Sequence, residues 1–286
     1  MTDQGADFVY SGSKSIPFML PNGLKEIVNY SIWETISDDT SRFPLIQYQE
    51  MDQVNSWHDQ LNIISIHAGN LDLEKLEKLQ DRNLVILLET DNIHGLAEQR
   101  RFFVELENKN LKLPVIIHRT YEAIKEDHFL LYASTDVGGL LIDGLGDGIM
   151  LSRKSGEGSL KSNTEYINQS SFGILQAART RITKTEYISC PSCGRTLFDL
   201  QETTAMIRAK TDHLKGVKIG IMGCIVNGPG EMADANYGYV GSGKGKITLY
   251  KGMDVVKKGV PSERAVEELI EIIKEDGAWI EPEKII

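Results

Sequence analysis

The stretch KIGIMGCIVNGPGEM, residues 218–232, joins a short apolar run to a glycine-rich turn that contains a cysteine and ends in a glutamate. A short apolar run bounded by turn residues is typical of a buried strand, so residues 217–222 are predicted to form one. Cys224 and Glu231 follow this strand, seven positions apart. The stretch therefore predicts a strand whose end presents a thiol and a carboxylate together.

A second pair of thiols precedes this stretch and follows the same pattern. Cys190 and Cys193 form a Cys-x-x-Cys motif directly after residues 185–189, TEYIS, which are also predicted to be a strand. Thirty residues separate this motif from Cys224. Because the carboxyl ends of neighbouring parallel strands meet at one edge of a sheet, we expect these three thiols and Glu231 to lie at a common edge.

Three thiols and one carboxylate narrow the metal chemistry. Soft sulfur ligands suit zinc or an iron–sulfur cluster and do not suit magnesium or calcium. A carboxylate on iron is harder and more exchangeable than a fourth cysteine, so it would leave one iron available to a substrate. The residues alone leave two other interpretations open: a structural zinc site formed by the three cysteines and His213, or three unrelated buried thiols.

The turn itself has a predicted geometry. Pro229 followed by Gly230 predicts a type II turn, because the third position of that turn requires a positive φ. Gly223 and Gly228 are expected to let the backbone pass close to a bulky group, with free amides that donate to its sulfurs. Asn227 is expected to contact a bound ligand.

Composition and charge exclude several classes of partner. The chain has 286 residues, a hydrophobic fraction of 41% and a formal net charge of −10. This charge disfavours nucleic acid and anionic membranes, so neither is predicted as a partner. The sequence has no signal peptide or membrane-spanning run, and its three cysteines do not make a disulfide framework. We therefore expect a soluble, cytoplasmic protein.

Residues 1–180 alternate short apolar strands with amphipathic helical patterns, the latter at residues 71–80, 93–109 and 163–180. Near-continuous apolar strands separated by helices indicate a parallel sheet covered on both faces. Eight such strands favour a (β/α)8-type barrel, with an open doubly wound sheet as the alternative. The predicted strands are residues 8–10, 45–49, 63–67, 84–89, 114–119, 129–134, 139–143 and 148–152.

Residues 181–286 are predicted to form a second, smaller α/β domain. Apolar side chains at helical spacing over residues 197–214 predict a helix between the two cysteine-bearing strands. The glycine-rich residues 237–252 predict a β-hairpin. Residues 261–277 predict an amphipathic helix that stops at Gly277.

Three segments of the second region carry a family resemblance. SCPSCGRTLFDL (residues 189–200), GIMGCIVNGPGE (220–231) and GYVGSGKGKITLYKG (238–252) closely resemble the C-terminal domain of the 4-hydroxy-3-methylbut-2-enyl diphosphate synthase family. The resemblance covers about residues 180–286. It implies a small α/β iron–sulfur domain with a fold like the cluster domain of sulfite and nitrite reductases.

The resemblance implies a [4Fe-4S] cluster held by Cys190, Cys193 and Cys224, with Glu231 as the fourth, displaceable ligand. Movement of Glu231 would free the apical iron for the substrate oxygen. Glu231 and Asn227 are therefore the candidate catalytic residues, the latter as a group that steadies developing negative charge.

The resemblance also implies an activity, that of an iron–sulfur oxidoreductase in the methylerythritol phosphate pathway of isoprenoid and terpenoid biosynthesis. In the family, 2-C-methyl-D-erythritol 2,4-cyclodiphosphate undergoes a two-electron reductive dehydroxylation to 4-hydroxy-3-methylbut-2-enyl diphosphate. The cluster passes electrons singly, so a ferredoxin or a flavodoxin is implied as the donor. The rival interpretation is a zinc-stabilised binding or scaffold module beside a barrel.

The first region departs from the family's usual pattern. The family's catalytic barrel begins with a VQSMT-like stretch, and residues 1–180 contain neither this stretch nor a basic diphosphate-binding set. Long members insert a further barrel-like domain before the cluster domain, and GGLLIDGLGDGIMLS (residues 138–152) resembles its end. We therefore interpret residues 1–180 as a TIM-barrel-like inserted spacer and residues 181–286 as the cluster domain. Turnover is expected to require a catalytic barrel from the same full-length chain or from a partner subunit.

Five polar residues of the first region stand at predicted strand ends, where a barrel enzyme holds its catalytic groups. In an independent barrel hydrolase or lyase, a His or Glu among them would act as a general base. In a spacer domain they are expected to bind the backbone or one another. These residues are His67, Glu89, His118, Arg119 and Asp143.

Three lysines stand in the predicted hairpin of the second region, namely Lys244, Lys246 and Lys251. They would suit an acidic electron carrier or a diphosphate. Lysines at the edge of a sheet are nevertheless common as solvated residues that prevent edge-to-edge association, so solvation is the favoured interpretation.

Overall fold

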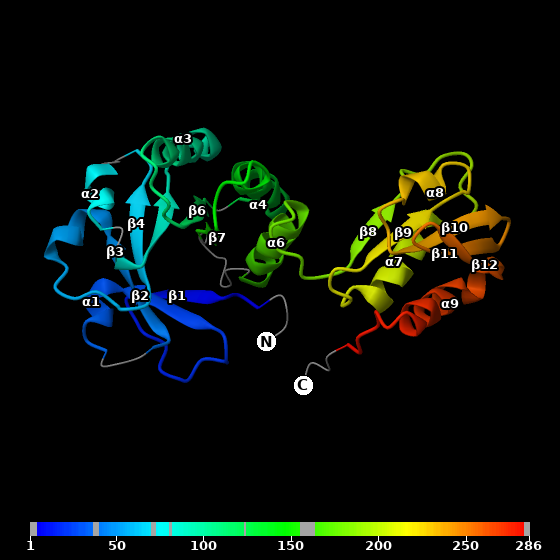
Figure 1. Ribbon diagram of the computed structural model, residues 1–286, viewed down its shortest axis with the longest axis horizontal. Coiled ribbons are helices and arrows are strands. Elements are labelled where there is room, and N and C mark those ends of the chain that lie inside the picture. The colour runs from blue at the N-terminus through cyan, green and yellow to red at the C-terminus, as the bar shows by residue number, and fades with distance from the viewer. Residues whose placement is uncertain are drawn as a thin grey trace. The chain divides into compact units, whose positions relative to one another are not determined.

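A computed structural model describes residues 5–36, 40–69, 73–79, 82–122, 124–154 and 164–282. The chain divides into two compact units, Met1–Arg181 and Ile182–Ile286. Each unit has its own β-sheet and hydrophobic core (Figure 1). No helix within these described ranges has the length and apolar character needed to span a bilayer.

The first unit is built on a seven-stranded sheet in which every neighbouring pair is parallel. Its strands follow one another in chain order from β1 to β7. A doubly wound sheet reverses its strand order at a switch point, and this sheet does not, so that alternative is wrong. The winding is that of a barrel, and the described strands form a half-barrel. They are β1 (Phe8–Gly12), β2 (Lys25–Asn29), β3 (Arg42–Gln47), β4 (Asn62–His67), β5 (Leu84–Glu89), β6 (Val115–Tyr121) and β7 (Gly148–Arg153).

Helical segments connect the successive strands of this unit, and their buried side chains contribute to its main hydrophobic core. Buried side chains of α3, such as Phe102 and Leu106, pack with Ile64, Ile86 and Leu88 from one face of the sheet. The other face carries a smaller apolar cluster. The helical segments are α1 (Tyr30–Trp33), η1 (Tyr48–Gln53), α2 (Leu73–Glu77), α3 (Gly95–Asn108), α4 (Glu126–Ala133), the π-helical η3 (Ser134–Gly138), α5 (Gly139–Ile142) and α6 (Thr164–Ala177).

Two of the eight predicted strands are wrong. Residues 129–134 and 139–143 fall in the continuous helical run of α4, η3 and α5. Phe129, Ala133 and Val137 are fully buried at i, i+4 spacing, which is the pattern of a helix buried on one face. Short apolar runs of this kind fit a buried strand equally well, so periodicity alone did not separate the two.

Strand β2 was not predicted, because its sequence KEIVN begins with two charged residues. Glu26 is nevertheless fully buried. Its carboxylate accepts hydrogen bonds from Arg42 Nε at 2.7 Å and from the amide of Ile16 at 2.7 Å. Burial by itself would raise the pKa of Glu26, but hydrogen bonds from Ser11, Ile16, Arg42 and Ser15 outweigh it and hold the pKa below its usual value. These partners therefore allow a charged residue to be buried in the strand.

The second unit has a five-stranded sheet in the order β12-β11-β10-β9-β8. Strands β8, β9 and β10 are parallel, and β11 and β12 continue the sheet antiparallel. In Figure 1, α8 lies on one side of this sheet and α7 and α9 on the other. The elements are β8 (Glu186–Ser189), α7 (Leu200–Thr211), β9 (Lys218–Met222), α8 (Gly228–Glu231), β10 (Tyr237–Gly243), β11 (Lys246–Lys251), β12 (Asp254–Pro261) and α9 (Ser262–Glu275).

The main elements predicted for this unit are present, with two differences. Helix α9 ends as predicted, just before Gly277 at φ +74°. Helix α7 begins at Leu200, where the side chain of Asp199 accepts the amide of Glu202 as an N-cap, so Leu197 lies in the preceding loop. The edge strand β12 was not predicted, because its exposed residues do not alternate between polar and apolar.

Candidate metal centre

The two cysteine-bearing segments leave the sheet at the same edge, as their spacing predicted. Strands β8 and β9 are parallel neighbours, with Ser189 opposite Ile221. The next residue, Cys190, continues this pairing, since its amide donates to the carbonyl of Ile221 at 3.3 Å. Cys224 follows the end of β9 two residues after Met222. The thiols therefore start from adjacent carboxyl ends of parallel strands.

Gly223 is the point where these segments contact one another. Its amide donates to Sγ of Cys190 at 3.3 Å, and its carbonyl accepts the amide of Leu197 at 3.1 Å. A Cβ atom on Gly223 would lie 2.7 Å from the side chain of Thr196. A Cβ atom on Gly241, in β10, would lie 2.4 Å from the carbonyl oxygen of Gly223. Only glycine at both positions permits this close packing of three segments.

The Cys-x-x-Cys loop is closed by Thr196. Its Oγ1 accepts the amide of Cys193 at 3.1 Å, and its own amide donates to the carbonyl of Cys193 at 3.0 Å. Ser192 adopts the left-handed conformation at φ +64°, which allows this tight reversal. Cys193 is exposed, whereas Cys190 and Cys224 are half-buried. The loop backbone is thus fixed while the thiols remain accessible.

The turn that bears Glu231 is not the predicted type II turn. Residues 228–231 form the single helical turn α8, in which the amide of Glu231 donates to the carbonyl of Asn227 at 3.0 Å. Pro229 occupies the first turn, where a missing N–H costs nothing. A Cβ atom on Gly228 would lie 2.7 Å from Cβ of Met222, so the close approach there is to protein. Gly230 has no positive φ.

Asn227 and Glu231 are both exposed at this turn. Asn227 precedes α8, and its side chain makes no capping hydrogen bond. The side-chain amide of Asn227 therefore does not cap the helix. Helix α8 itself is anchored by Met232, which is fully buried against Met222 and Val240. This anchoring keeps the turn beside the end of β9.

Arg195 links the two halves electrostatically, and the sequence reasoning missed it. The backbone amide and then the side chain of Arg195 donate to Cys193 and lower the pKa of its thiol. Conversely, Cys193, Cys224 and Glu231 all raise the pKa of Arg195, by hydrogen bonding and by their negative charge. One cation therefore lies in the field of two thiols and the carboxylate. Its place two residues after Cys193, in the CPSCGR motif, was the sequence signal that could have identified it.

The structure does not bring His213 to the three cysteines, as the zinc site considered from the sequence requires. Within the described ranges, no three His, Cys, Asp or Glu side chains converge as they stand on one metal position, and all three thiols are free. His213, the proposed fourth zinc ligand, follows α7 near the amino ends of β8 and β9. Its Nε2 lies 2.8 Å from the carbonyl of Ile280, so it is at the opposite edge of the sheet.

Three of the five strand-end residues of the first unit bind one another or their neighbours. His118 Nδ1 lies 3.0 Å from Glu89 Oε1, and its Nε2 lies 3.2 Å from Ser152 Oγ. The hydrogen bond from His118 is the main cause of the lowered pKa of Glu89. His67 pairs with exposed Asp91 at 3.1 Å. These three side chains are therefore paired within the first unit.

The other two strand-end residues serve the helix layer. Arg119 is buried, donates to Asp136 Oδ2 at 2.9 Å, and donates to the carbonyl of Thr90 at 3.1 Å. Asp143 forms an exposed ion pair with Arg100. Neither pair lies with Glu89 and His118, so the five residues do not form one site.

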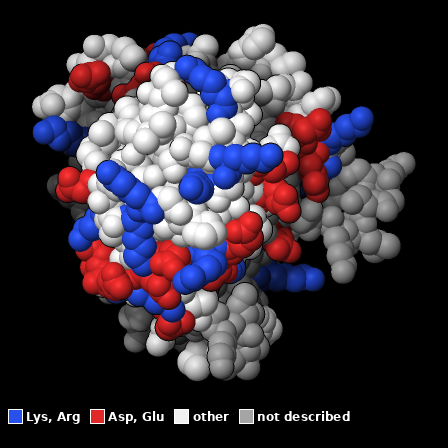
Figure 2. Space-filling view, turned by 90° about the vertical axis from the view of Figure 1, so that its right-hand side faces the viewer, with Lys and Arg blue, Asp and Glu red and all other residues white. Residues whose placement is uncertain are grey.

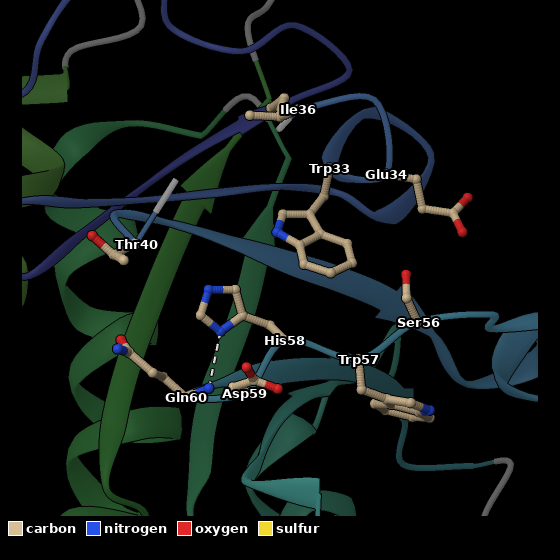
Figure 3. Close-up of a pocket in the computed structure, with 9 residues that line it drawn as sticks. All are labelled: Trp33, Glu34, Ile36, Thr40, Ser56, Trp57, His58, Asp59 and Gln60. Atoms are coloured by element: carbon tan, nitrogen blue, oxygen red, sulfur yellow. Dashed lines mark hydrogen bonds between the residues drawn. The ribbon is translucent and has the colours of Figure 1, made fainter. Parts of the chain in front are cut away.

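The first unit also has a pocket, which Figure 3 shows in close-up. The rings of Trp33 and His58 point toward one another there, with centroids 5.9 Å apart. His58 Nδ1 accepts the amide of Gln60 at 3.0 Å. The pocket lies beside the amino ends of β3 and β4, opposite the edge at which barrels hold their chemistry.

Comparison with known proteins agrees with the resemblance. Residues 186–275 match the family described as GcpE protein C-terminal domain. The chain is 44% identical over 275 residues to the 4-hydroxy-3-methylbut-2-en-1-yl diphosphate synthase (flavodoxin) of Parabacteroides distasonis, covering 96% of this chain and 43% of that protein. It is 51% identical over 209 residues to the synthase (flavodoxin) of Porphyromonas gingivalis, covering 73% of this chain and 35% of that protein.

A plant protein shows the same relationship. The chain is 47% identical over 220 residues to the chloroplastic synthase (ferredoxin) of Arabidopsis thaliana, covering 75% of this chain and 29% of that protein. The chain thus spans less than half the length of the curated relatives it matches. On these matches, the chain belongs to the 4-hydroxy-3-methylbut-2-en-1-yl diphosphate synthase family and includes its GcpE C-terminal domain.

Proposed function

We propose that residues 182–286 hold a [4Fe-4S] cluster and form the electron-handling part of a 4-hydroxy-3-methylbut-2-en-1-yl diphosphate synthase. Cys190, Cys193 and Cys224 would be its thiolate ligands, with Glu231 as the displaceable fourth. The observation that carries the proposal is the hydrogen bond from the Gly223 amide to Cys190 Sγ, which brings the two ligand segments together at one edge.

The residues around the thiols fit such a group. An N–H donor to a ligand sulfur and a nearby cation both stabilise negative charge on iron–sulfur clusters. The Gly223 amide is such a donor, and Arg195 is such a cation. The backbone is fixed by Thr196 and by the Gly223 contacts, while Cys193 and Glu231 are exposed enough to turn toward a cluster.

The proposed reaction is the reductive conversion of 2-C-methyl-D-erythritol 2,4-cyclodiphosphate to 4-hydroxy-3-methylbut-2-enyl diphosphate. The bound cluster would supply single electrons and a Lewis-acidic iron. Glu231 can move aside because it stands, exposed, at the end of a four-residue helix. The side chain of Asn227, which makes no capping hydrogen bond, and the guanidinium of Arg195 would stabilise negative charge on a bound substrate.

The first unit has no catalytic role in this proposal. We interpret Met1–Arg181 as the inserted, TIM-barrel-like spacer of long family members, because its strand-end polar groups are paired with one another or with the helix layer. Substrate binding would then need the family's catalytic barrel, and a flavodoxin or ferredoxin in the cytoplasm would supply electrons. The 286-residue chain alone is not expected to make product.

The proposal is tested by anaerobic reconstitution of the chain with iron and sulfide. We expect brown protein with about four irons per chain, an EPR signal on reduction and Mössbauer spectra of a cubane cluster. Cys193→Ser should lose most of this iron. Colourless protein with one tightly bound zinc would instead establish the scaffold interpretation.

Glu231 is tested with a small iron ligand. Glu231→Ala should retain most iron and bind cyanide, seen as a spectral shift, at lower cyanide concentration than the unsubstituted chain. Asp234→Ala removes an exposed carboxylate just beyond α8 and serves as the matched control. If Glu231→Ala loses the cluster entirely, Glu231 is a structural ligand and the displacement mechanism is wrong.

A further inference from the structure

The hairpin between β10 and β11 lies at the same edge of the sheet as the cysteines. Strands β10 and β9 are parallel, with Val240 opposite Met222, so Gly241 comes level with Gly223. The close approach of Gly241 to the Gly223 carbonyl places the two strands in contact there. Lys244 is three residues beyond Gly241, which puts its backbone within about 10 Å of that contact.

Two exposed lysines occupy this hairpin, Lys244 and Lys246. Across the described ranges of the chain, neither ammonium group has an ion-pair partner. Four other lysines of this unit are neutralised by carboxylates: Lys210 by Glu267, Lys218 by Glu186, Lys251 by Asp276 and Lys257 by Glu268.

Lys251, the third lysine of the predicted hairpin, is separated from this pair by the length of β11. It lies at the opposite edge, where it also lines a pocket with Lys215 and Asp276. Lys251 is therefore paired with Asp276 and far from the cysteines. Lys244 and Lys246 lie close to the cysteines and have no ion-pair partner in the described part of the chain.

Exposed apolar side chains stand at the same edge of the sheet as the two lysines. Leu197, Ile225 and Val226, in the loops that follow β8 and β9, are exposed by 39%, 48% and 63%. Figure 2 views the right-hand side of Figure 1 and shows Lys and Arg side chains over an area of uncharged surface, with acidic side chains on the right as well as toward the lower left. Exposed acids at this edge include Glu231, Glu263 and Asp199, the N-cap of α7.

The hairpin and Glu231 leave the edge toward opposite faces of the sheet. The Gly245 carbonyl accepts the amide of Ser262, the first residue of α9, which packs on one face. Met232, next to Glu231, packs on the other face. A molecule on the hairpin would therefore leave the Glu231 side open to a substrate.

From these relationships we propose that Lys244 and Lys246, with the apolar rim of Leu197, Ile225 and Val226, form the docking surface for an acidic electron-carrier protein. The proposal rests on the proposed function, which requires such a carrier. A basic pair on a chain of net charge −10 gives the charge complementarity that selects an acidic partner and orients it. Redox partners bind through small, transient interfaces, so two charges and a short apolar rim are sufficient.

The test measures binding of oxidised flavodoxin, and separately of a plant-type ferredoxin, to the 286-residue chain at low and high salt. Lys244→Gln/Lys246→Gln should raise the flavodoxin Kd about three- to tenfold at low salt, the effect of losing two exposed charge pairs. High salt should erase this difference. Lys215→Gln/Lys251→Gln carries the same net charge at the opposite edge and should change Kd less than about twofold.

Binding is measured with chain that has reconstituted iron and with chain that has none. This comparison distinguishes a failure of the docking surface from a failure of the proposed function. Lysine-dependent binding to both forms supports the docking surface even if no cluster forms, whereas electron transfer from the reduced carrier occurs only if the cluster is present. Equal effects of the two double variants, or no binding of either carrier, would overturn the docking surface. So would inorganic diphosphate binding that depends on Lys244 and Lys246 while neither carrier binds, because the hairpin would then be a small-anion site.

Discussion

The amide nitrogen of Gly223 lies 3.3 Å from Sγ of Cys190 and donates to it, although 33 residues separate the two. This bond joins the end of β9 to the start of the Cys-x-x-Cys loop. Hydrogen bonds to ligand sulfurs help to set the reduction potential of iron–sulfur clusters. In the proposed function Gly223 would therefore have two roles, since it aligns the two cysteine-bearing segments and donates to a proposed ligand.

We predict that Gly223→Ala disrupts this alignment. Its Cβ would lie 2.7 Å from Oγ1 and 3.1 Å from Cβ of Thr196, so Thr196 itself must move. Overpacking of this kind costs about 1–3 kcal/mol of folding free energy. Urea denaturation should show this loss, and iron per chain after reconstitution should fall.

Gly230→Ala is the matched control for that change. A Cβ atom on Gly230 would meet no atom within 4 Å, and Gly230 has no positive φ. We expect unchanged iron content and unchanged or slightly raised stability, because alanine favours the helical turn α8. Equal loss of iron in the two variants would contradict the role given to Gly223.

Thr196 offers a test of the loop that is independent of steric clash. Thr196→Val keeps the shape of the side chain but removes the Oγ1 that accepts the amide of Cys193. An amide left without its partner costs about 1–3 kcal/mol where it is buried and less in this exposed loop. We expect lower iron retention on dilution with a chelator, and recovery in Thr196→Ser. A valine variant that retains iron as well as the unsubstituted chain would show that this bond is dispensable.

The two arginine–aspartate pairs of the first unit should differ sharply in their contribution to stability. Asp136→Ala leaves the guanidinium of Arg119 buried without its partner, and we expect a loss of about 3–5 kcal/mol. Asp143→Ala breaks the exposed pair with Arg100 and should cost less than about 1 kcal/mol. Chemical denaturation of both variants measures the difference. Similar losses would mean that Arg119 has water or another partner.

Glu89 should make stability depend on pH on the acid side. His118 lowers the pKa of Glu89 from its ordinary value of 4.5, so the folded state binds this proton less readily than the unfolded chain. The resulting stabilisation is complete above pH 4.5 and is lost as the pH falls through the lowered folded pKa. In Glu89→Gln the fall in the urea midpoint between neutral and acidic pH should therefore be smaller. An identical pH profile in the two proteins would show that the pair contributes nothing.

The pattern of apolar residues along the sequence predicted part of the fold correctly and failed for short buried runs. Helix α9 and strand β9 were predicted because each has a regular apolar period and a clear stop. Residues 129–134 and 139–143 were misassigned as strands because a short run buried against a sheet carries the same apolar residues whether it is helical or extended. Glu26 shows the opposite case, in which a charge that looks like a surface residue is buried because Arg42 neutralises it.

The sequence by itself determined which groups are available to a cluster, because Cys190, Cys193, Cys224 and Glu231 stand just after predicted strands. Only the tertiary structure decided that Arg195 lies in the field of both segments and that Lys244 is close to the cysteines while Lys251 is not. The physical reason is the range of each interaction. Spacing and turn chemistry act over a few residues, whereas strand order and charge proximity depend on contacts between segments far apart along the chain.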